Sequence, residues 1–246
     1  MASEKTRAIV IRLVEFSESS CVVTLFTEDF GKIGALAKGA RRPKSAFEGA
    51  LDLLALVRIV FLHKSSEALD LVTEAKLERR FRAGQRDLAR LYAGYYVAEL
   101  LAELTDASDP HCELFVAAEQ TLLALDQSAD VPAAVLRFEL AALRLVGHLP
   151  SLDQCVACGR AVEAEGRAAF GMTAGGVLCA ACRPGRRQVV SVSGPVITAM
   201  RQAASGGEWT IDVKYQGELR AVMANYVAHQ VGHRLRTSEY LAASAK

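Results

Sequence analysis

The hydrophobic positions of the first eighty residues fall into short runs rich in β-branched side chains, separated by polar turns. Runs of this length and composition predict β-strands. We expect strands over residues 7–16, 20–27, 32–38, 50–64 and 69–75. The long apolar run in 50–64 also suits a buried helix, but its Val, Ile and Phe residues favour a strand. Five short strands with hairpin spacing predict a closed barrel of the oligonucleotide-binding (OB) kind, although an SH3-like barrel fits the count almost as well.

From residue 85 onward the hydrophobic positions recur at the spacing of amphipathic helices. We expect a first helix after Gln85, a second capped by Asp109 with Pro110 in its first turn, and a third from about residue 130 to Gly147. Two further helices are expected at 193–200 and 218–236. Short connections between such helices are typical of a small bundle.

Four cysteines stand in two pairs with the spacing C-x2-C-x20-C-x2-C. Each Cys-x-x-Cys turn places two sulfurs on one side of a tight knuckle, and two facing knuckles supply the tetrahedral thiolate set that Zn2+ accepts. The alternatives are two disulfides or four reduced thiols. Because a four-thiolate site leaves no position for a catalytic water, we expect one structural zinc ion per chain. Its predicted ligands are Cys155, Cys158, Cys179 and Cys182.

These patterns together predict an α+β multidomain protein. Its N-terminal five-stranded OB-like β-barrel is followed by an α-helical domain with an inserted four-cysteine zinc knuckle. The expected divisions are an OB-fold nucleic-acid-binding domain over 1–80, a first helical part over 81–150, a four-cysteine zinc module over 151–188, and a second helical part over 189–246.

The remaining cysteines bear on the cellular compartment. Cys21 and Cys112 stand alone among apolar residues, where buried inert thiols are expected. Unpaired cysteines beside a Cys-x-x-Cys pattern favour a reducing cytoplasm over a secreted disulfide scaffold. No run of uncharged apolar residues is long enough for a transmembrane helix, and the N-terminal segment lacks the apolar core of a signal peptide.

Charge is unevenly distributed although the net charge is only +1. Residues 32–64 contain seven basic side chains against two acidic ones, whereas residues 81–149 contain five arginines against ten acids. The cations of the first segment crowd a loop whose Gly39 lets the backbone approach a phosphate, and arginine binds phosphate oxygens in a bidentate way. We therefore predict DNA-backbone binding there, with little sequence preference. The predicted DNA-binding residues are Lys32, Lys38, Arg41, Arg42 and Lys44, extended by a second cluster of Arg183, Arg186 and Arg187.

Other chemistry has weaker support. The sequence contains no phosphate-binding loop, no dinucleotide fingerprint, no H-E-x-x-H and no G-x-S-x-G. His229 and His233 are four residues apart and can form a metal pair, but two ligands without a third are more often packing or surface residues. Phe30 and Phe47 flank the cationic loop and can stack on bases, although a place in the core explains each of them more simply. The second arginine cluster can equally be a solvated loop.

The order of these parts resembles a known family. A barrel containing TLFTEDFGKIGALAKGARRPKS, a helical domain, a C-x2-C…C-x2-C knuckle and a final helix ending HRLRTSEYL is similar to the bacterial RecO family of DNA repair proteins. The resemblance covers the chain from the first strand to Leu241. Its most specific element is the turn at Gly31 and Lys32 leading into the loop of Lys38–Arg42.

The resemblance implies a recombination mediator that is not an enzyme. It implies binding to single- and double-stranded DNA, annealing of complementary strands, and work with RecR. It further implies contact with the acidic tail of the single-stranded DNA-binding protein, indirect action on RecA, and a cytoplasmic, nucleoid-associated location without a membrane partner. Two alternatives of other classes stay open: a zinc-ribbon nucleic-acid enzyme and a zinc-containing transcription regulator.

Overall fold

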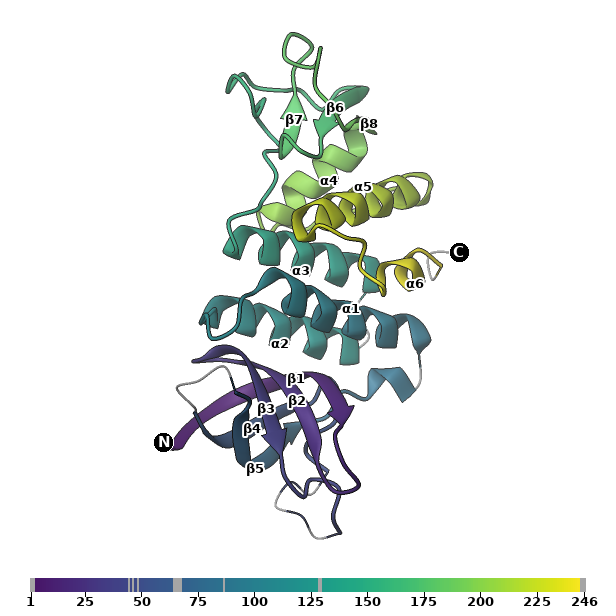
Figure 1. Ribbon diagram of the computed structural model, residues 1–246. Coiled ribbons are helices and arrows are strands. Elements are labelled where there is room, and N and C mark those ends of the chain that lie inside the picture. The colour runs from purple at the N-terminus through teal and green to yellow at the C-terminus, as the bar shows by residue number, and fades with distance from the viewer. Residues whose placement is uncertain are drawn as a thin grey trace. The chain divides into compact units, whose positions relative to one another are not determined.

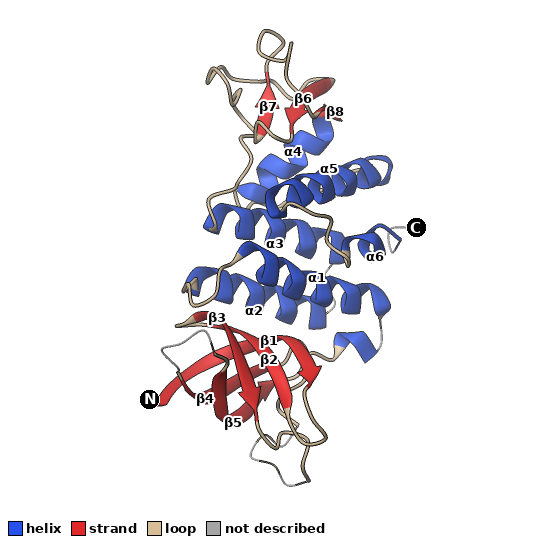
Figure 2. Ribbon diagram, in the orientation of Figure 1, coloured by secondary structure: helices blue, strands red, loops and turns tan. Residues whose placement is uncertain are grey.

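The computed structural model describes residues 3–43, 45, 47, 49–63, 68–85, 87–127 and 130–243. The chain forms two compact units, Met1–Val131 and Pro132–Lys246. This division falls at the first residue of the third α-helix, whereas the sequence placed boundaries near residues 80, 150 and 188. Figures 1 and 2 show the strands and helices of each unit. In the described part of the chain, no helix is long and apolar enough to cross a membrane.

The first unit begins with a closed five-stranded barrel. Its strands are β1 (Ser3–Glu15), β2 (Cys21–Thr27), β3 (Gly31–Ala37), β4 (Leu56–Leu62) and β5 (Asp70–Arg79). The order around the barrel is β1-β2-β3-β5-β4, and β1 closes it by pairing antiparallel with both β2 and β4. Only the β3–β5 pair is parallel. This Greek-key order, with five strands, is that of an OB-like barrel and confirms the predicted fold.

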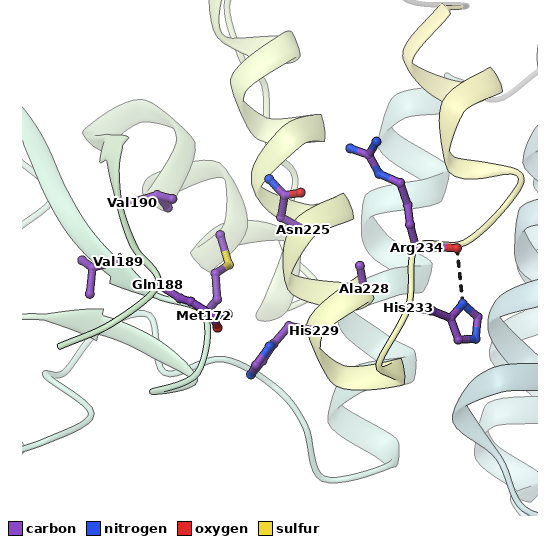
Figure 3. A pocket seen from close by; sticks show the side chains of 9 residues that line it. All are labelled: Met172, Gln188, Val189, Val190, Asn225, Ala228, His229, His233 and Arg234. Atoms are coloured by element: carbon purple, nitrogen blue, oxygen red, sulfur yellow. Dashed lines mark hydrogen bonds between the residues drawn. The ribbon is translucent and has the colours of Figure 1, made fainter.

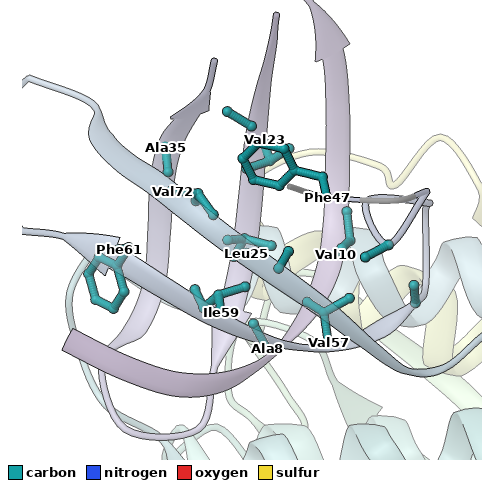
Figure 4. Packing of buried hydrophobic residues seen from close by; sticks show 14 of the residues in the cluster. Ala8, Val10, Val23, Leu25, Ala35, Phe47, Val57, Ile59, Phe61 and Val72 are labelled. Carbon is teal, nitrogen blue, oxygen red and sulfur yellow. The ribbon is translucent and has the colours of Figure 1, made fainter. Parts of the chain in front are cut away.

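The barrel interior is filled by one face of each strand. Alternating residues point inward, as a pleated strand requires, and Figure 4 shows Val23, Leu25, Ile59 and Phe61 directed into the same core. Burying each such side chain contributes about 1.5–3 kcal/mol relative to leaving it in water. The run at 50–64, which also suited a helix, forms a strand as its β-branched residues predicted, but β4 covers only Leu56–Leu62 of it.

Two helices follow the barrel in the first unit, α1 (Leu88–Leu104) and α2 (Cys112–Asp126). A short 3-10 turn at Ala83–Gln85 precedes α1. Asp87 caps α1 by accepting hydrogen bonds from the backbone N–H groups of Ala89 and Arg90. The predicted cap of α2 was wrong. His111 occupies the N-cap position, and the Asp109 carboxylate lies 3.0 Å from the His111 ring instead.

The second unit carries the inserted module between helices. Its elements are α3 (Val131–Leu145), β6 (Arg167–Gly171), β7 (Gly176–Leu178), β8 (Val189–Ser193), α4 (Gly194–Ala204), α5 (Val213–Val231) and α6 (Ser238–Ala243). The three strands form a small antiparallel sheet in the order β7-β6-β8, and the cysteine pairs lie on either side of β6 and β7 in the chain. The sequence predicted neither this sheet nor α6, because both are short.

The boundaries of α5 also differ from those expected. The helix begins at Val213, where the Asp212 carboxylate accepts a hydrogen bond from the backbone N–H of Lys214. It ends at Val231 because Gly232 adopts a left-handed conformation, with φ of 84°. The expected start near residue 218 and end near residue 236 were therefore wrong. Gly147 ends α3 in the same left-handed way, as predicted.

Candidate nucleic-acid interface and metal centre

The loop that follows β3 is a tight, exposed turn. Lys38, Arg41 and Arg42 are all exposed on it. Gly39 has φ of 73°, and its carbonyl accepts a hydrogen bond from the Arg42 backbone N–H at 3.0 Å. A glycine is needed here because side chains strongly disfavour a positive φ. The turn therefore directs several cations to solvent within a few residues. Lys44, also predicted to bind DNA, lies outside the described residues.

This cationic loop is fastened to the turn between β1 and β2. The Arg41 backbone N–H donates to the Ser19 carbonyl at 3.1 Å, and the Gly39 N–H donates to the Ser20 hydroxyl at 3.3 Å. The Arg41 guanidinium also pairs with Glu15 at 2.9 Å. Because this pair is largely exposed, it holds the arginine only weakly. The Glu15 carboxylate nevertheless neutralises part of the Arg41 charge. Lys38 and Arg42 are therefore the better placed of the three to bind a phosphate.

Lys32 lies apart from the loop and has a contact within the protein. Its ammonium donates hydrogen bonds of 2.5 Å to the carbonyls of Ala102 and Thr105, at the C-terminal end of α1. A cation at this position satisfies carbonyls that the helix leaves unpaired. Burial lowers the pKa of Lys32 below its ordinary value, and the nearby Glu103 and Asp106 carboxylates offset only part of this shift. The geometry gives Lys32 a structural role within the protein, so it is a poorer candidate for a phosphate contact than Lys38 or Arg42.

Of the aromatic residues flanking the loop, Phe47 lies in the barrel core and Phe30 is partly buried against it. Phe47 is 3% exposed within the barrel core, and Phe30 packs edge-to-face on Phe61 with ring centroids 5.3 Å apart. The sequence did not single out Phe16, which directly follows β1 and is exposed beside Lys38 and Arg42. Its position directly before a Ser-Glu-Ser-Ser turn was the only available signal.

The four predicted zinc ligands meet in one cluster. The Sγ atoms of Cys155, Cys158, Cys179 and Cys182 all lie within 4.8 Å of one another. Cys158 Sγ and Cys179 Sγ are 3.8 Å apart. A tetrahedral site with Zn–S bonds of about 2.3 Å has sulfur–sulfur edges of about 3.8 Å. The donors therefore fit a zinc ion, and none of the six cysteines, which are all described, forms a disulfide.

Each knuckle is built by backbone hydrogen bonds that the Cys-x-x-Cys spacing allows. The Cys155 carbonyl accepts from Cys158 and Gly159, at 3.3 and 2.8 Å, and the Cys179 carbonyl accepts from Cys182 and Arg183, both at 3.1 Å. The Cys179 backbone N–H donates to the Cys155 sulfur and, with further amides, lowers the pKa of Cys155 to about 6. Backbone amides thus stabilise the thiolate form that a metal ion requires.

Arg201 of α4 holds the base of the first knuckle. Its guanidinium donates to the Leu152 carbonyl at 2.9 and 2.7 Å and to the Val162 carbonyl at 2.6 Å. It also pairs with Asp153 at 3.0 Å. The half-buried Arg201 guanidinium therefore connects Leu152 and Val162, which lie on either side of Cys155 and Cys158 in the chain. Beyond the second knuckle, the arginines of the second cluster, Arg183, Arg186 and Arg187, are all exposed.

The lone cysteines have different environments. Cys21 is buried in the barrel, and burial raises its pKa, as expected for an inert thiol. Cys112 is exposed at the first residue of α2, so its predicted burial was wrong.

Comparison with known proteins accounts for both parts of the chain. Residues 1–81 match a family model described as "Recombination protein O N terminal", and residues 85–239 match one described as "Recombination protein O C terminal". The chain belongs to the RecO family of DNA repair proteins. The cationic loop lies in the part matched by the N-terminal RecO model, and the cysteine cluster lies in the part matched by the C-terminal one.

Several proteins named DNA repair protein RecO align with the chain. That of Rhodopirellula baltica is 48% identical over 202 residues, covering 82% of this chain and 75% of its own length. That of Anaeromyxobacter dehalogenans is 35% identical over 246 residues, covering 98% of this chain and 96% of its own. That of Moorella thermoacetica is 29% identical over 246 residues, covering 96% and 90%. The resemblance to RecO noted from the sequence is thereby confirmed.

A hollow of about 370 Å³ lies at the end of α5 in the RecO C-terminal part. Figure 3 shows the His229 ring beside Gln188 and Met172, while the His233 ring turns away towards the Arg234 carbonyl, 3.3 Å from its Nδ1. The two histidines therefore do not converge on one point. Among the described residues, the cysteines are the only group of three or more His, Cys, Asp or Glu side chains close enough to hold a metal ion.

Proposed function

We propose that this protein is a DNA-binding recombination mediator that breaks no covalent bond. In this role it binds single- and double-stranded DNA and anneals complementary single strands. With RecR, it helps to load RecA onto DNA coated by the single-stranded DNA-binding protein, whose acidic tail it contacts. We place this activity in the cytoplasm, at the nucleoid. Membership of the RecO family supports the proposal, and the exposed cationic loop on the barrel is the observation that carries it.

The loop chemistry suits this task. Lys38, Arg41 and Arg42 neutralise phosphates and release counterions, which gives affinity without reading base identity. Neutralising two strands at once lowers their mutual repulsion, so complementary segments can pair. Contact with the acidic tail tethers the protein to coated DNA and raises its local concentration there. Lys44 is a further proposed phosphate ligand of the first unit, and Arg183, Arg186 and Arg187 form a separate proposed phosphate-binding cluster in the second unit.

We also propose that Cys155, Cys158, Cys179 and Cys182 hold one structural zinc ion per chain. When bound, a four-thiolate zinc ion supplies folding energy and no catalytic water. The cluster dimensions and the backbone amides that favour the Cys155 thiolate support this assignment. The knuckles hold Arg183 next to the fourth cysteine, so the ion fixes the base of the second cationic cluster.

The test reverses charge on the loop. The R41E/R42E variant should bind DNA of every sequence more weakly, and on a single strand the slope of log K against log salt should flatten by about 0.7 for each lost phosphate contact. Fluorescence anisotropy at several salt concentrations measures both quantities. Because Arg41 also pairs with Glu15, R42E alone is the cleaner variant. K76E makes the same kind of charge change at an exposed position of β5 and serves as the control.

A second readout follows the reaction. Strand annealing should be accelerated by the wild-type protein, with and without single-stranded DNA-binding protein, and less so by R41E/R42E. Equal DNA affinity of the double variant and the wild type at all salt concentrations would contradict the loop assignment. Magnesium-dependent cleavage or joining of DNA by the pure protein would contradict the proposal that it breaks no bond.

A further inference from the structure

The end of the β1–β2 hairpin exposes apolar side chains beside the cationic loop. β1 has an irregularity between Val10 and Arg12, after which its residues turn towards solvent. Leu13 and Val14 are exposed there, and Phe16 exposes 66% of its surface. Of the nine phenylalanines, which are all described, Phe16 is the only exposed one. A large aromatic ring in water costs free energy unless it has a partner.

The backbone that carries the Phe16 ring is held in place by local hydrogen bonds. The backbone N–H groups of Phe16 and Ser17 both donate to the Ser20 carbonyl, at 3.0 and 3.1 Å. The Ser20 N–H donates back to the Ser17 hydroxyl at 3.2 Å. This closed turn is the one to which the Gly39 and Arg41 amides bind. The aromatic residue and the cations therefore belong to one preorganised surface, which reduces the entropy lost on binding.

The two loops enclose a hollow of about 330 Å³. It is lined by Phe16, Ser17, Ser20, Leu36, Lys38, Gly39 and Arg42. The lining combines an aromatic side chain, two cations and two hydroxyl groups. A nucleotide carries the matching set: a flat base that stacks on an aromatic face, and a phosphate that binds lysine and arginine.

We propose that Phe16 is a base-stacking residue which, with Lys38 and Arg42, binds one nucleotide of single-stranded DNA. This inference rests on the proposed DNA-binding function and adds selectivity to it. The cations alone bind the phosphates of either form of DNA. In a duplex the base faces are covered by their neighbours, so only a single strand offers a face to Phe16. The barrel therefore prefers an unpaired strand.

Replacing Phe16 separates stacking from charge. F16A should weaken binding to a single strand by about 5- to 150-fold, the range given by one lost base–aromatic stack. Its affinity for an abasic strand and for duplex DNA should stay within about twofold of wild type, and its salt slope should not change, since no phosphate contact is lost. F16W should retain affinity. L88A, which truncates an exposed apolar side chain on α1, should bind like wild type.

A spectroscopic variant reports the contact directly. Trp209 is the only tryptophan, so F16W in a W209F background gives a protein whose single tryptophan lies at position 16. Its emission should be quenched by a base-bearing strand and not by an abasic one. If F16A lowers the affinity for base-bearing, abasic and duplex DNA equally, or for none of them, Phe16 does not stack. If the wild type itself binds no DNA, the proposed function fails, which is a different result.

Discussion

Gly31 and Lys32 attach the segment after α1 to the barrel. Gly31 has φ of 68°, and a Cβ atom there would lie 2.0 Å from the Asp109 carbonyl oxygen. Lys32 binds the last carbonyls of α1 through its side chain, and its own carbonyl accepts from the Ser108 N–H at 2.9 Å. The turn at Gly31 and Lys32 therefore fixes both the C-terminal end of α1 and the loop that follows that helix.

The residue-scale prediction concerns this close approach. G31A should destabilise the protein by more than about 2 kcal/mol, because it adds strain at a positive φ to a clash with rigid backbone. G217A is the matched control, since Gly217 lies within α5 and a Cβ there meets nothing within 4 Å. That change should stabilise by about 0.5–1 kcal/mol. Urea denaturation measures both, and an unchanged midpoint for G31A would contradict the argument.

At the scale of elements, a buried ion pair joins α3 to α5. Glu139 is fully buried, and the Arg220 guanidinium binds both of its carboxylate oxygens, with Nη1 at 3.0 Å from Oε2. Neither residue was singled out from the sequence. The two residues are 81 positions apart in the chain, and nothing near either one in the sequence indicates its partner.

Removing one member should cost more than removing both. E139L and R220M alone should each destabilise by about 3–5 kcal/mol, because each leaves a buried charge without its counterion. The double variant E139L/R220M should recover much of that loss, since two apolar side chains can fill the same space. Thermal and urea unfolding of the four proteins give the coupling free energy. Purely additive losses would show that the pair does not act as a unit.

At the scale of the whole molecule, each compact unit has its own core. The barrel of the first unit closes without any residue from the second, and the cysteine cluster, the small sheet and Arg201 all lie in the second. Metal binding should therefore stabilise one unit selectively. This separation also places the proposed strand-binding loop and the metal centre in different units.

The corresponding prediction uses metal removal. Wild-type protein should contain one zinc ion per chain by elemental analysis. Chelation, or C179S, should increase amide hydrogen exchange in residues 151–188 and leave exchange in the barrel strands unchanged. C112S is the control, because Cys112 is remote in sequence from the cluster and its loss should leave zinc content unchanged. Equal protection of residues 151–188 with and without metal would contradict a structural role.

Features that depend on residues close together in the chain could be predicted from the sequence alone. Runs of β-branched side chains specified the five barrel strands, because strand preference is a local property. The spacing of Cys155, Cys158, Cys179 and Cys182 specified a metal-binding cluster, because each knuckle is closed by hydrogen bonds within five residues. The cations after β3 and the resemblance to the RecO family were also readable from the chain alone.

Features that depend on residues distant in the chain were set by the tertiary structure. It directed Lys32 to the end of α1 rather than to the cationic loop, and it placed Phe47 in the barrel core and Phe30 against that core. It also brought Phe16 next to Lys38 and Arg42 through hydrogen bonds between two turns. The charge and apolar character of these residues were visible in the sequence. Barrel closure and strand register decide which of these residues face solvent together. No local sequence pattern encodes barrel closure or strand register.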